Sequence, residues 1–153
     1  MLFIKNKSAL SLMAEGGKLL ASCMEMLENS IKPGMSTLEL DKLAYKYIIS
    51  SGAKPSFLGM YGFPNTLCIS VNEEVIHGIP KRNKIIKEGD LVSVDGGVYL
   101  HGFHTDMART FMVGNVQEEY KLLVERTKQS FYEGMSFARE GCRVSDGCHG
   151  CLL

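Results

Sequence analysis

Two aspartates, Asp95 and Asp106, lie eleven residues apart in the second half of the chain. The residues between them resemble two strands joined by a two-residue turn at His101-Gly102. This spacing predicts a β-hairpin in which Asp95 pairs with Ala108. Asp106 is then the diagonal neighbour of Asp95 on the same face, about 5–8 Å away. Two carboxylates at that separation repel each other unless one is protonated or a cation lies between them.

A divalent metal ion is the cation that such a pair suits best. Carboxylate oxygens bind hard or borderline ions such as Mg²⁺, Mn²⁺, Fe²⁺ and Zn²⁺, and a two-metal site uses bridging carboxylates at this kind of separation. His104, two residues before Asp106, points to the same face and is a candidate direct or indirect ligand. From spacing alone, however, two solvated aspartates near strand ends are the simpler interpretation.

His77 is the histidine best placed to act on a substrate. The glycine and proline that follow it, in His77-Gly78-Ile79-Pro80, fix a loop that can hold an imidazole at a cleft. There it can donate to a substrate carbonyl or a developing oxyanion. A lone loop histidine is more often simply exposed, so this motif needs support from elsewhere in the chain.

Aromatic and methionine side chains alternate with glycines between Phe57 and Phe63. Such a loop can form a soft apolar pocket, and walls of Met60 and aromatic rings suit a thioether ligand. Local packing beneath a sheet is the alternative interpretation of the same residues.

Helical patterns precede and follow the segments that carry these groups. Apolar residues at spacings of three and four over residues 10–31 predict an amphipathic helix that Pro33 ends. A capping box, Ser36–Glu39, predicts the start of a second helix, which stops near Gly52. The helical period returns from Val116 onward.

The middle of the chain has the alternation of strands. The pattern predicts strands over residues 66–71, 91–95, 98–100 and 105–113, with the basic segment Lys81–Lys87 exposed. Helices, then strands, then a helix indicate an α+β fold with an antiparallel sheet. A short internal similarity links the turn after the first helix to the one after the third. In each, a basic residue stands two positions before a glycine (Gly34 or Gly141), and an acidic residue follows the glycine by five.

Composition excludes several classes of protein. The 153 residues predict one domain, and 17 basic against 17 acidic residues give no net charge to attract nucleic acid or an anionic membrane. No apolar run is long enough to cross a membrane, and the N-terminus does not resemble a secretory signal. Of the five cysteines, Cys23 and Cys68 are expected to be buried free thiols, which favours a reducing, cytoplasmic location.

Several of these motifs occur together, in order, in one known family. Cys68–Glu73 leading to His77–Pro80, then Gly89-Asp90 with Val94-Asp95, then Gly102–Asp106 resemble type I methionine aminopeptidase. The resemblance extends from the first helix to about Asp146. It implies the first half of a pita-bread fold, in which an antiparallel sheet is flanked by helices. The implied activity is removal of the initiator methionine from nascent proteins by two divalent metal ions (Co, Mn, Fe or Zn).

The resemblance also implies roles for individual residues. Asp95 would be a ligand of one ion and Asp106 would bridge both. His77 would contact the substrate near the scissile amide. The methionine pocket would be lined by Phe57, Met60, Phe63 and Cys68; the family more often has Cys and Tyr at the first three of these positions. The N-terminal methionine of nascent peptides would be the substrate, and the ribosome a possible partner.

The chain departs from the family pattern near its end. The family's remaining ligands, one histidine and two glutamates, have no counterpart in this sequence. Residues 1–146 are therefore interpreted as the N-terminal half of the catalytic domain. Residues 147–153, with their glycines and cysteines, have poor helix character and are interpreted as an aberrant or frameshifted tail. We expect weak metal binding, little peptidase activity and association through uncovered sheet and helix surfaces.

Two other functions are carried forward. One is a non-catalytic pita-bread-like module that binds peptides or proteins. The other is a redox or zinc-binding role for Cys148 and Cys151, which form a CxxC motif without the second cysteine pair of a structural zinc site.

Overall fold

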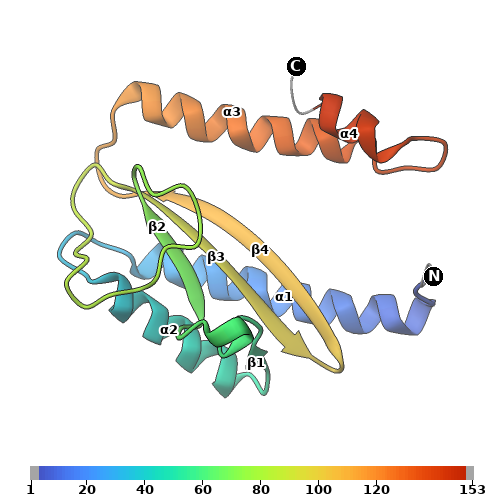
Figure 1. Cartoon of the computed structure of the whole chain (residues 1–153), viewed down its shortest axis with the longest axis horizontal. Helices are drawn as coiled ribbons and strands as arrows, with labels where there is room; N and C mark the ends of the chain where they lie inside the picture. The colour runs from blue at the N-terminus through green and yellow to red at the C-terminus, as the bar shows by residue number, and fades with distance from the viewer. Residues whose placement is uncertain (1–3, 151–153) are drawn as a thin grey trace. The chain divides into compact units, whose positions relative to one another are not determined.

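The computed structural model describes residues 4–150, and the chain divides into two compact units, Met1–Asn115 and Val116–Leu153. In the first unit, α1 (Lys7–Ser30) and α2 (Thr37–Ser50) precede β1 (Lys54–Pro55), a short 3₁₀ turn η1 (Met60–Gly62), β2 (Leu67–Val71), β3 (Leu91–Leu100) and β4 (Phe103–Met112). Figure 1 shows this order. The predicted α+β class and its antiparallel sheet are confirmed.

The sheet is built around β3. β4 pairs with one edge of β3 along its whole length, while β1 and β2 pair with the other edge at opposite ends. The turn at His101 and Gly102 has positive φ at both residues, 51° and 87°, as a two-residue hairpin with the twist of its strands requires. The hairpin is therefore the one that the sequence predicts, although β3 is continuous where two short strands were expected.

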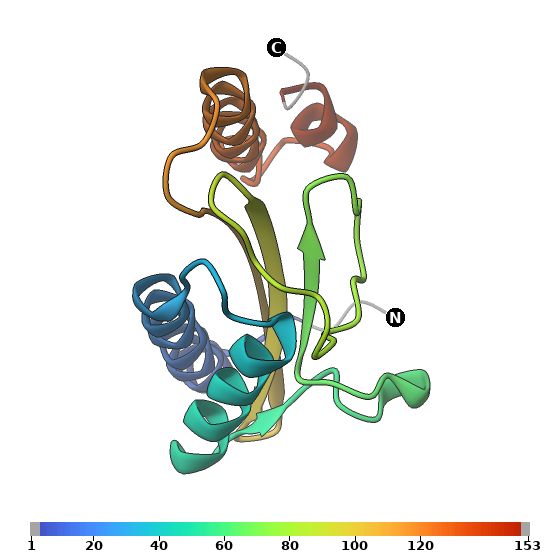
Figure 2. The same ribbon diagram turned by 90° about the vertical axis from the view of Figure 1, so that its left-hand side faces the viewer.

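Both helices cover the same face of the sheet, as Figure 2 shows. Alternate residues of β3 point into this core, where Val92, Val94 and Val98 are fully buried against side chains of α1 and α2. The core also contains Ile86, which is 0% exposed. The prediction that Lys81–Lys87 is exposed is therefore wrong at this position, because an apolar side chain within a basic segment has been drawn into the core. The opposite face of β3 carries Asp95.

The predicted capping box at the start of α2 is present. The Glu39 carboxylate accepts from the backbone N–H of Ser36 at 2.8 Å, and the Ser36 hydroxyl accepts from the N–H of Glu39 at 3.2 Å. These bonds satisfy N–H groups that a helix leaves without partners in its first turn.

The second unit contains α3 (Glu118–Met135) and α4 (Val144–Gly150). Its turn repeats the features of the turn between α1 and α2: Gly141 has φ +87°, as Gly34 has +90°. The Asp146 carboxylate accepts from the backbone N–H of Arg143 at 2.8 Å. This cap starts a short helix whose backbone continues through residues 147–150, where the composition predicts poor helix character. Within residues 4–150, none of the helices has the length and apolar composition of a membrane span.

Candidate functional site

The β3–β4 hairpin places the two aspartates on one face of the sheet. Asp95 pairs with Ala108, and Asp106 pairs with Gly97. Because Asp95 and Gly97 are two residues apart on one strand, they and their partners face the same side. The predicted register is confirmed, and Asp106 is the diagonal neighbour of Asp95.

The electrostatics of Asp95 show that the two carboxylates interact. Burial raises the pKa of Asp95 above its ordinary value of 3.8, and the negative charge of Asp106 raises it further. His77 acts in the opposite direction and lowers the pKa of Asp95. A half-buried carboxylate beside a like charge is relieved by a proton or by a bound cation, so the pair fits a divalent metal ion.

The loop before His77 turns back along β2 and brings the imidazole toward Asp95. The backbone N–H of Ile69 donates to the Gly78 carbonyl at 2.7 Å, and the N–H of Gly78 donates to the Ser70 hydroxyl at 3.1 Å. His77 itself is exposed, with a left-handed φ of 58°. Since β2 pairs with β3 at this point, the side chain of His77 is near enough to affect the ionisation of Asp95.

Cys68 lies opposite Asp95 in the β2–β3 register and is 7% exposed. Burial is the main cause that raises the pKa of its thiol to about 11, and the charges of Asp95, Asp106 and Asp41 add to it. The thiol is therefore protonated at neutral pH and behaves as a small apolar side chain. Cys23, also buried, has its pKa raised to about 11 by burial alone. The prediction of two buried free thiols is confirmed.

The segment Phe57–Phe63 forms a compact turn around η1. The N–H of Gly59 donates to the Phe63 carbonyl at 2.8 Å, which closes the loop on itself. Phe57 is half-buried beside Gly97, on the face that carries the aspartates. Met60, by contrast, is 47% exposed at the tip. The structure thus brings Phe57, Cys68 and His77 to the aspartate pair and leaves Met60 open to solvent.

Asp41 is an important residue that the sequence analysis did not single out. It is 5% exposed, and its carboxylate accepts from the Asn65 side-chain amide and from the backbone N–H groups of Thr66 and Leu67, all at 2.9 Å. These bonds fix the chain between the loop and β2. The signal was present in the sequence, since an aspartate next to Leu40 in an apolar helix face needs buried partners.

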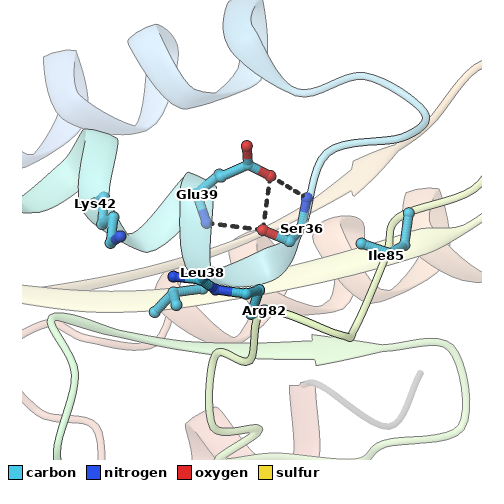
Figure 3. Close-up of a pocket in the computed structure, with 6 residues that line it drawn as sticks. All are labelled: Ser36, Leu38, Glu39, Lys42, Arg82 and Ile85. Atoms are coloured by element: carbon cyan, nitrogen blue, oxygen red, sulfur yellow. Dashed lines mark hydrogen bonds between the residues drawn. The ribbon is translucent and has the colours of Figure 1, made fainter.

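A separate hollow of about 270 Å³ lies at the start of α2, and Figure 3 shows its lining. Its walls are Ser36, Leu38, Glu39, Lys42, Arg82 and Ile85. Hydrogen bonds from Ser36 are the main cause that lowers the pKa of Glu39, and the nearby charges of Lys42 and Arg82 add to them. The hollow shares no lining residue with the aspartate pair, and its carboxylate is already engaged in capping α2.

The described residues provide only part of a metal site. Among the side chains that the structure describes, those of residues 4–147, no group of three or more histidine, cysteine or acidic residues is placed to hold a metal ion. His104 lies on the aspartate face, but its Nδ1 is 2.9 Å from the Ser56 hydroxyl, so this nitrogen is already engaged. The CxxC motif for which a redox or zinc-binding role is predicted lies outside the described residues, which include neither the side chain of Cys148 nor any part of Cys151.

The chain is similar over nearly its whole length to methionine aminopeptidases. It is 47% identical over 146 residues to the enzyme of Clostridium perfringens, covering 95% of this chain and 58% of that protein. It is 44% identical over 149 residues to methionine aminopeptidase 1 of Bacillus subtilis, covering 97% and 60%. The chain therefore spans somewhat more than half the length of these relatives.

Solved structures show the same relationship. The crystal structure of a methionine aminopeptidase from Thermotoga maritima superimposes with a TM-score of 0.94 at 35% identity, covering 98% of this chain and 60% of that one. The antiparallel sheet flanked by helices is therefore the predicted pita-bread architecture, present over about half of the fold.

A family model described as metallopeptidase family M24 matches residues 11–150. This range covers most of α1, all of α2 and the hairpin of the first unit, together with α3 and α4. A metallopeptidase family implies a divalent metal cofactor, for which the carboxylate pair provides chemically suitable ligands. The chain belongs to metallopeptidase family M24.

Proposed function

We propose that this chain carries half of a metal-dependent site that removes the N-terminal methionine from proteins. The observation that carries the proposal is the pair Asp95 and Asp106 on one face of the hairpin, with His77 and Cys68 beside Asp95. Similarity to methionine aminopeptidases supports the choice of substrate.

In this proposal, Asp95 is a ligand of one divalent ion and Asp106 bridges two. The ions, drawn from Co, Mn, Fe or Zn, would supply Lewis acidity and lower the pKa of bound water. Both carboxylates must be ionised to bind them. Burial, and then repulsion from Asp106, raise the pKa of Asp95 in the metal-free chain. A cation bound between the two carboxylates would relieve that repulsion and favour their ionised forms.

His77 has the role of holding the scissile amide. The bond between Gly78 and β2 holds the loop of His77 at this strand, and the exposed imidazole is close enough to lower the pKa of Asp95. An imidazole N–H in that position can donate to a substrate carbonyl as charge develops on it. His77 would thus orient and polarise the substrate without itself binding metal.

The methionine side chain would lie against Phe57, Met60, Phe63 and Cys68. Cys68 is protonated, and Phe57 and Phe63 are half-buried, so the wall is apolar and polarizable, as a thioether requires. Nascent chains, presented by the ribosome, are the source of such substrates in this proposal.

A second candidate function is a module that binds peptides without cleaving them. It is favoured by the incomplete metal site, because the part of the chain described by the structure contributes two carboxylates and no third ligand. The two candidates differ in one property, which is selective metal binding at Asp95 and Asp106.

Titration of the 153-residue chain with Mn²⁺, followed by electron paramagnetic resonance, distinguishes them. We expect weak binding that Asp95→Asn and Asp106→Asn each abolish, while Glu125→Gln, a change at an exposed carboxylate on α3, leaves it intact. Binding that is absent, or that survives both aspartate substitutions, would favour the binding module. Hydrolysis of a Met-Ala peptide should be slow or undetectable, since two carboxylates are few for a two-metal site.

A further inference from the structure

The face of β3 that carries Asp95 has no room for a side chain at Gly97, which is buried. A Cβ atom placed on Gly97 would lie 2.9 Å from the Ser56 Cβ and 3.2 Å from the Phe57 Cε1, which is too close for ordinary carbon contacts. The backbone N–H of Ser56 donates to the Gly97 carbonyl at 2.9 Å. The missing side chain therefore lets the start of the Phe57–Phe63 loop lie directly on the sheet.

A side-chain contact fixes the same segment to the neighbouring strand. The Ser56 hydroxyl and His104 Nδ1 are 2.9 Å apart. The His104 ring also packs against Tyr99, its cross-strand partner, with ring centroids 4.7 Å apart. The imidazole is thus held by an aromatic ring and a hydroxyl, which leaves it little freedom to rotate.

These contacts connect the loop to the strand that carries a carboxylate. His104 and Asp106 are alternate residues of β4 and share one face, and Asp106 pairs with Gly97. His104 is therefore two residues from Asp106 along β4, and Gly97, on which Ser56 packs, lies across from it. Any shift of β4 moves the loop and the carboxylate together.

We propose that Ser56 and His104 form a loop anchor, in which Ser56 bonds to His104 and packs on Gly97. This loop anchor sets the distance between the Phe57–Phe63 loop and the carboxylate pair. Ser56 and His104 are positioning residues, because they act through the loop. The functional meaning of the anchor rests on the function proposed above: a methionine side chain held by the loop would be placed in a fixed register with a metal ion at Asp95 and Asp106. The anchor itself does not depend on that function.

Amide hydrogen exchange in the ¹⁵N-labelled 153-residue chain tests the anchor. In Ser56→Ala and in His104→Ala, the amides of Gly59 and Phe63, bonded within the loop, should exchange about three- to tenfold faster, as the loss of one partly exposed hydrogen bond predicts. Amides of β3 should be unchanged, which also shows that the variants fold. The double variant should be no faster than the faster single variant, because both remove the same bond.

Conservative variants separate this bond from a general loss of packing. Ser56→Thr keeps the hydroxyl and His104→Asn places an amide near the position of Nδ1, so both should restore slow exchange. Ser50→Ala is the matched control, since the Ser50 hydroxyl donates only to a carbonyl of its own helix, that of Tyr47. Exchange that is unchanged in the alanine variants, or additive in the double variant, overturns the proposal.

Paramagnetic broadening by Mn²⁺ alone tests the link to the carboxylates. Mn²⁺ bound there should broaden the amide signals of Ser56 and Phe57. Ser56→Ala should weaken that broadening while changing Mn²⁺ affinity by less than about twofold, because it removes no charge. Undiminished broadening at equal affinity would refute the anchor. If the unmodified chain shows no broadening that depends on Asp95 and Asp106, the proposed function fails, and the exchange experiment still decides the anchor.

Discussion

The backbone N–H of Ile69 donates to the carbonyl oxygen of Gly78 at 2.7 Å, so the residue after His77 is hydrogen-bonded to the backbone of β2. The approach is so close that a Cβ atom on Gly78 would collide with the carbonyl group of Ile69, whose carbon would be 2.7 Å away. The position of a Cβ atom is fixed by its own backbone, and the atoms that it would meet are backbone atoms of Ile69 and Ser70, so no side-chain rotation can relieve the collision. It explains why a glycine follows the histidine.

Gly78→Ala should therefore release the His77 loop from β2. We expect a loss of about 1–3 kcal/mol in the free energy of unfolding, as for other overpacked sites, measured by urea denaturation. Gly17→Ala on α1 is the matched control, because nothing lies within 4 Å of its added Cβ. That control should stabilise the chain by about 0.5–1 kcal/mol through helix propensity. Equal effects of the two substitutions would contradict this account.

Asp41→Ala should destabilise the junction between the loop and β2. It leaves two backbone N–H groups and the Asn65 amide without their acceptor in a buried site. Leaving a buried donor without its acceptor costs about 1–3 kcal/mol, so for three donors we expect a loss of at least about 3 kcal/mol in chemical denaturation. Asp41→Asn retains one acceptor oxygen and should lose less. A loss below 1 kcal/mol for the alanine variant, by the same scale, would mean that water replaces the carboxylate.

Asp95→Asn should stabilise the metal-free chain. The pKa of Asp95 is raised in the folded state, so the folded chain binds more protons than the unfolded chain between the ordinary value and the raised one. Protonated Asp95 therefore contributes to the free energy of unfolding in full at pH values below the pKa of Asp95 in the unfolded chain. This contribution is lost as pH rises through the higher pKa of Asp95 in the folded chain. The advantage of the asparagine variant in free energy of unfolding should therefore grow as pH rises above 3.8 and then level off. A constant difference across pH would show that ionisation is not the cause.

The same substitution should change the reactivity of a neighbouring thiol. The charge of Asp95 helps to raise the pKa of Cys68 to about 11. Its removal should lower that pKa and increase the thiolate fraction, giving a few-fold faster alkylation by iodoacetamide at pH 8, since the thiolate is the nucleophile. Cys23 is the internal control, because burial alone raises its pKa. Mass spectrometry of both cysteines in one sample measures the ratio. Equal acceleration at Cys23 would indicate general loosening of the fold.

Local sequence patterns predicted most of the elements in the first unit. The capping box fixes the start of α2, and the two-residue turn at His101-Gly102 fixes the register that places Asp106 opposite Gly97. Each of these features is determined by residues within a few positions of one another in the chain, so it can be recognised in the sequence alone. The same is true of the buried thiols, which lie among apolar residues.

What the sequence did not predict depends on contacts between distant segments. Ser56 meets His104 across 48 residues, and Asp41 meets Thr66 across 25. Ile86 enters the core because Gly34 and Met35 pair with it in the backbone. No local period encodes such contacts. The roles of Asp95, Asp106 and His77 in binding metal and substrate stay predictions, as does the interpretation of residues 147–153.

The two adjacent glycines of β3 give the sheet a locally reduced thickness. A Cβ on Gly96 would meet Leu67 and Met24 in the core, while one on Gly97 would meet Ser56 and Phe57 on the other side. At this point only the main chain separates the two compartments. A change in side-chain packing near Met24 therefore displaces the main chain of β3, and with it Ser56 and Phe57, without involving any side chain of β3. Substitutions at Met24 or Leu67 should consequently shift the Phe57–Phe63 loop and the face that carries Asp95 and Asp106, while the residues of that face are unchanged.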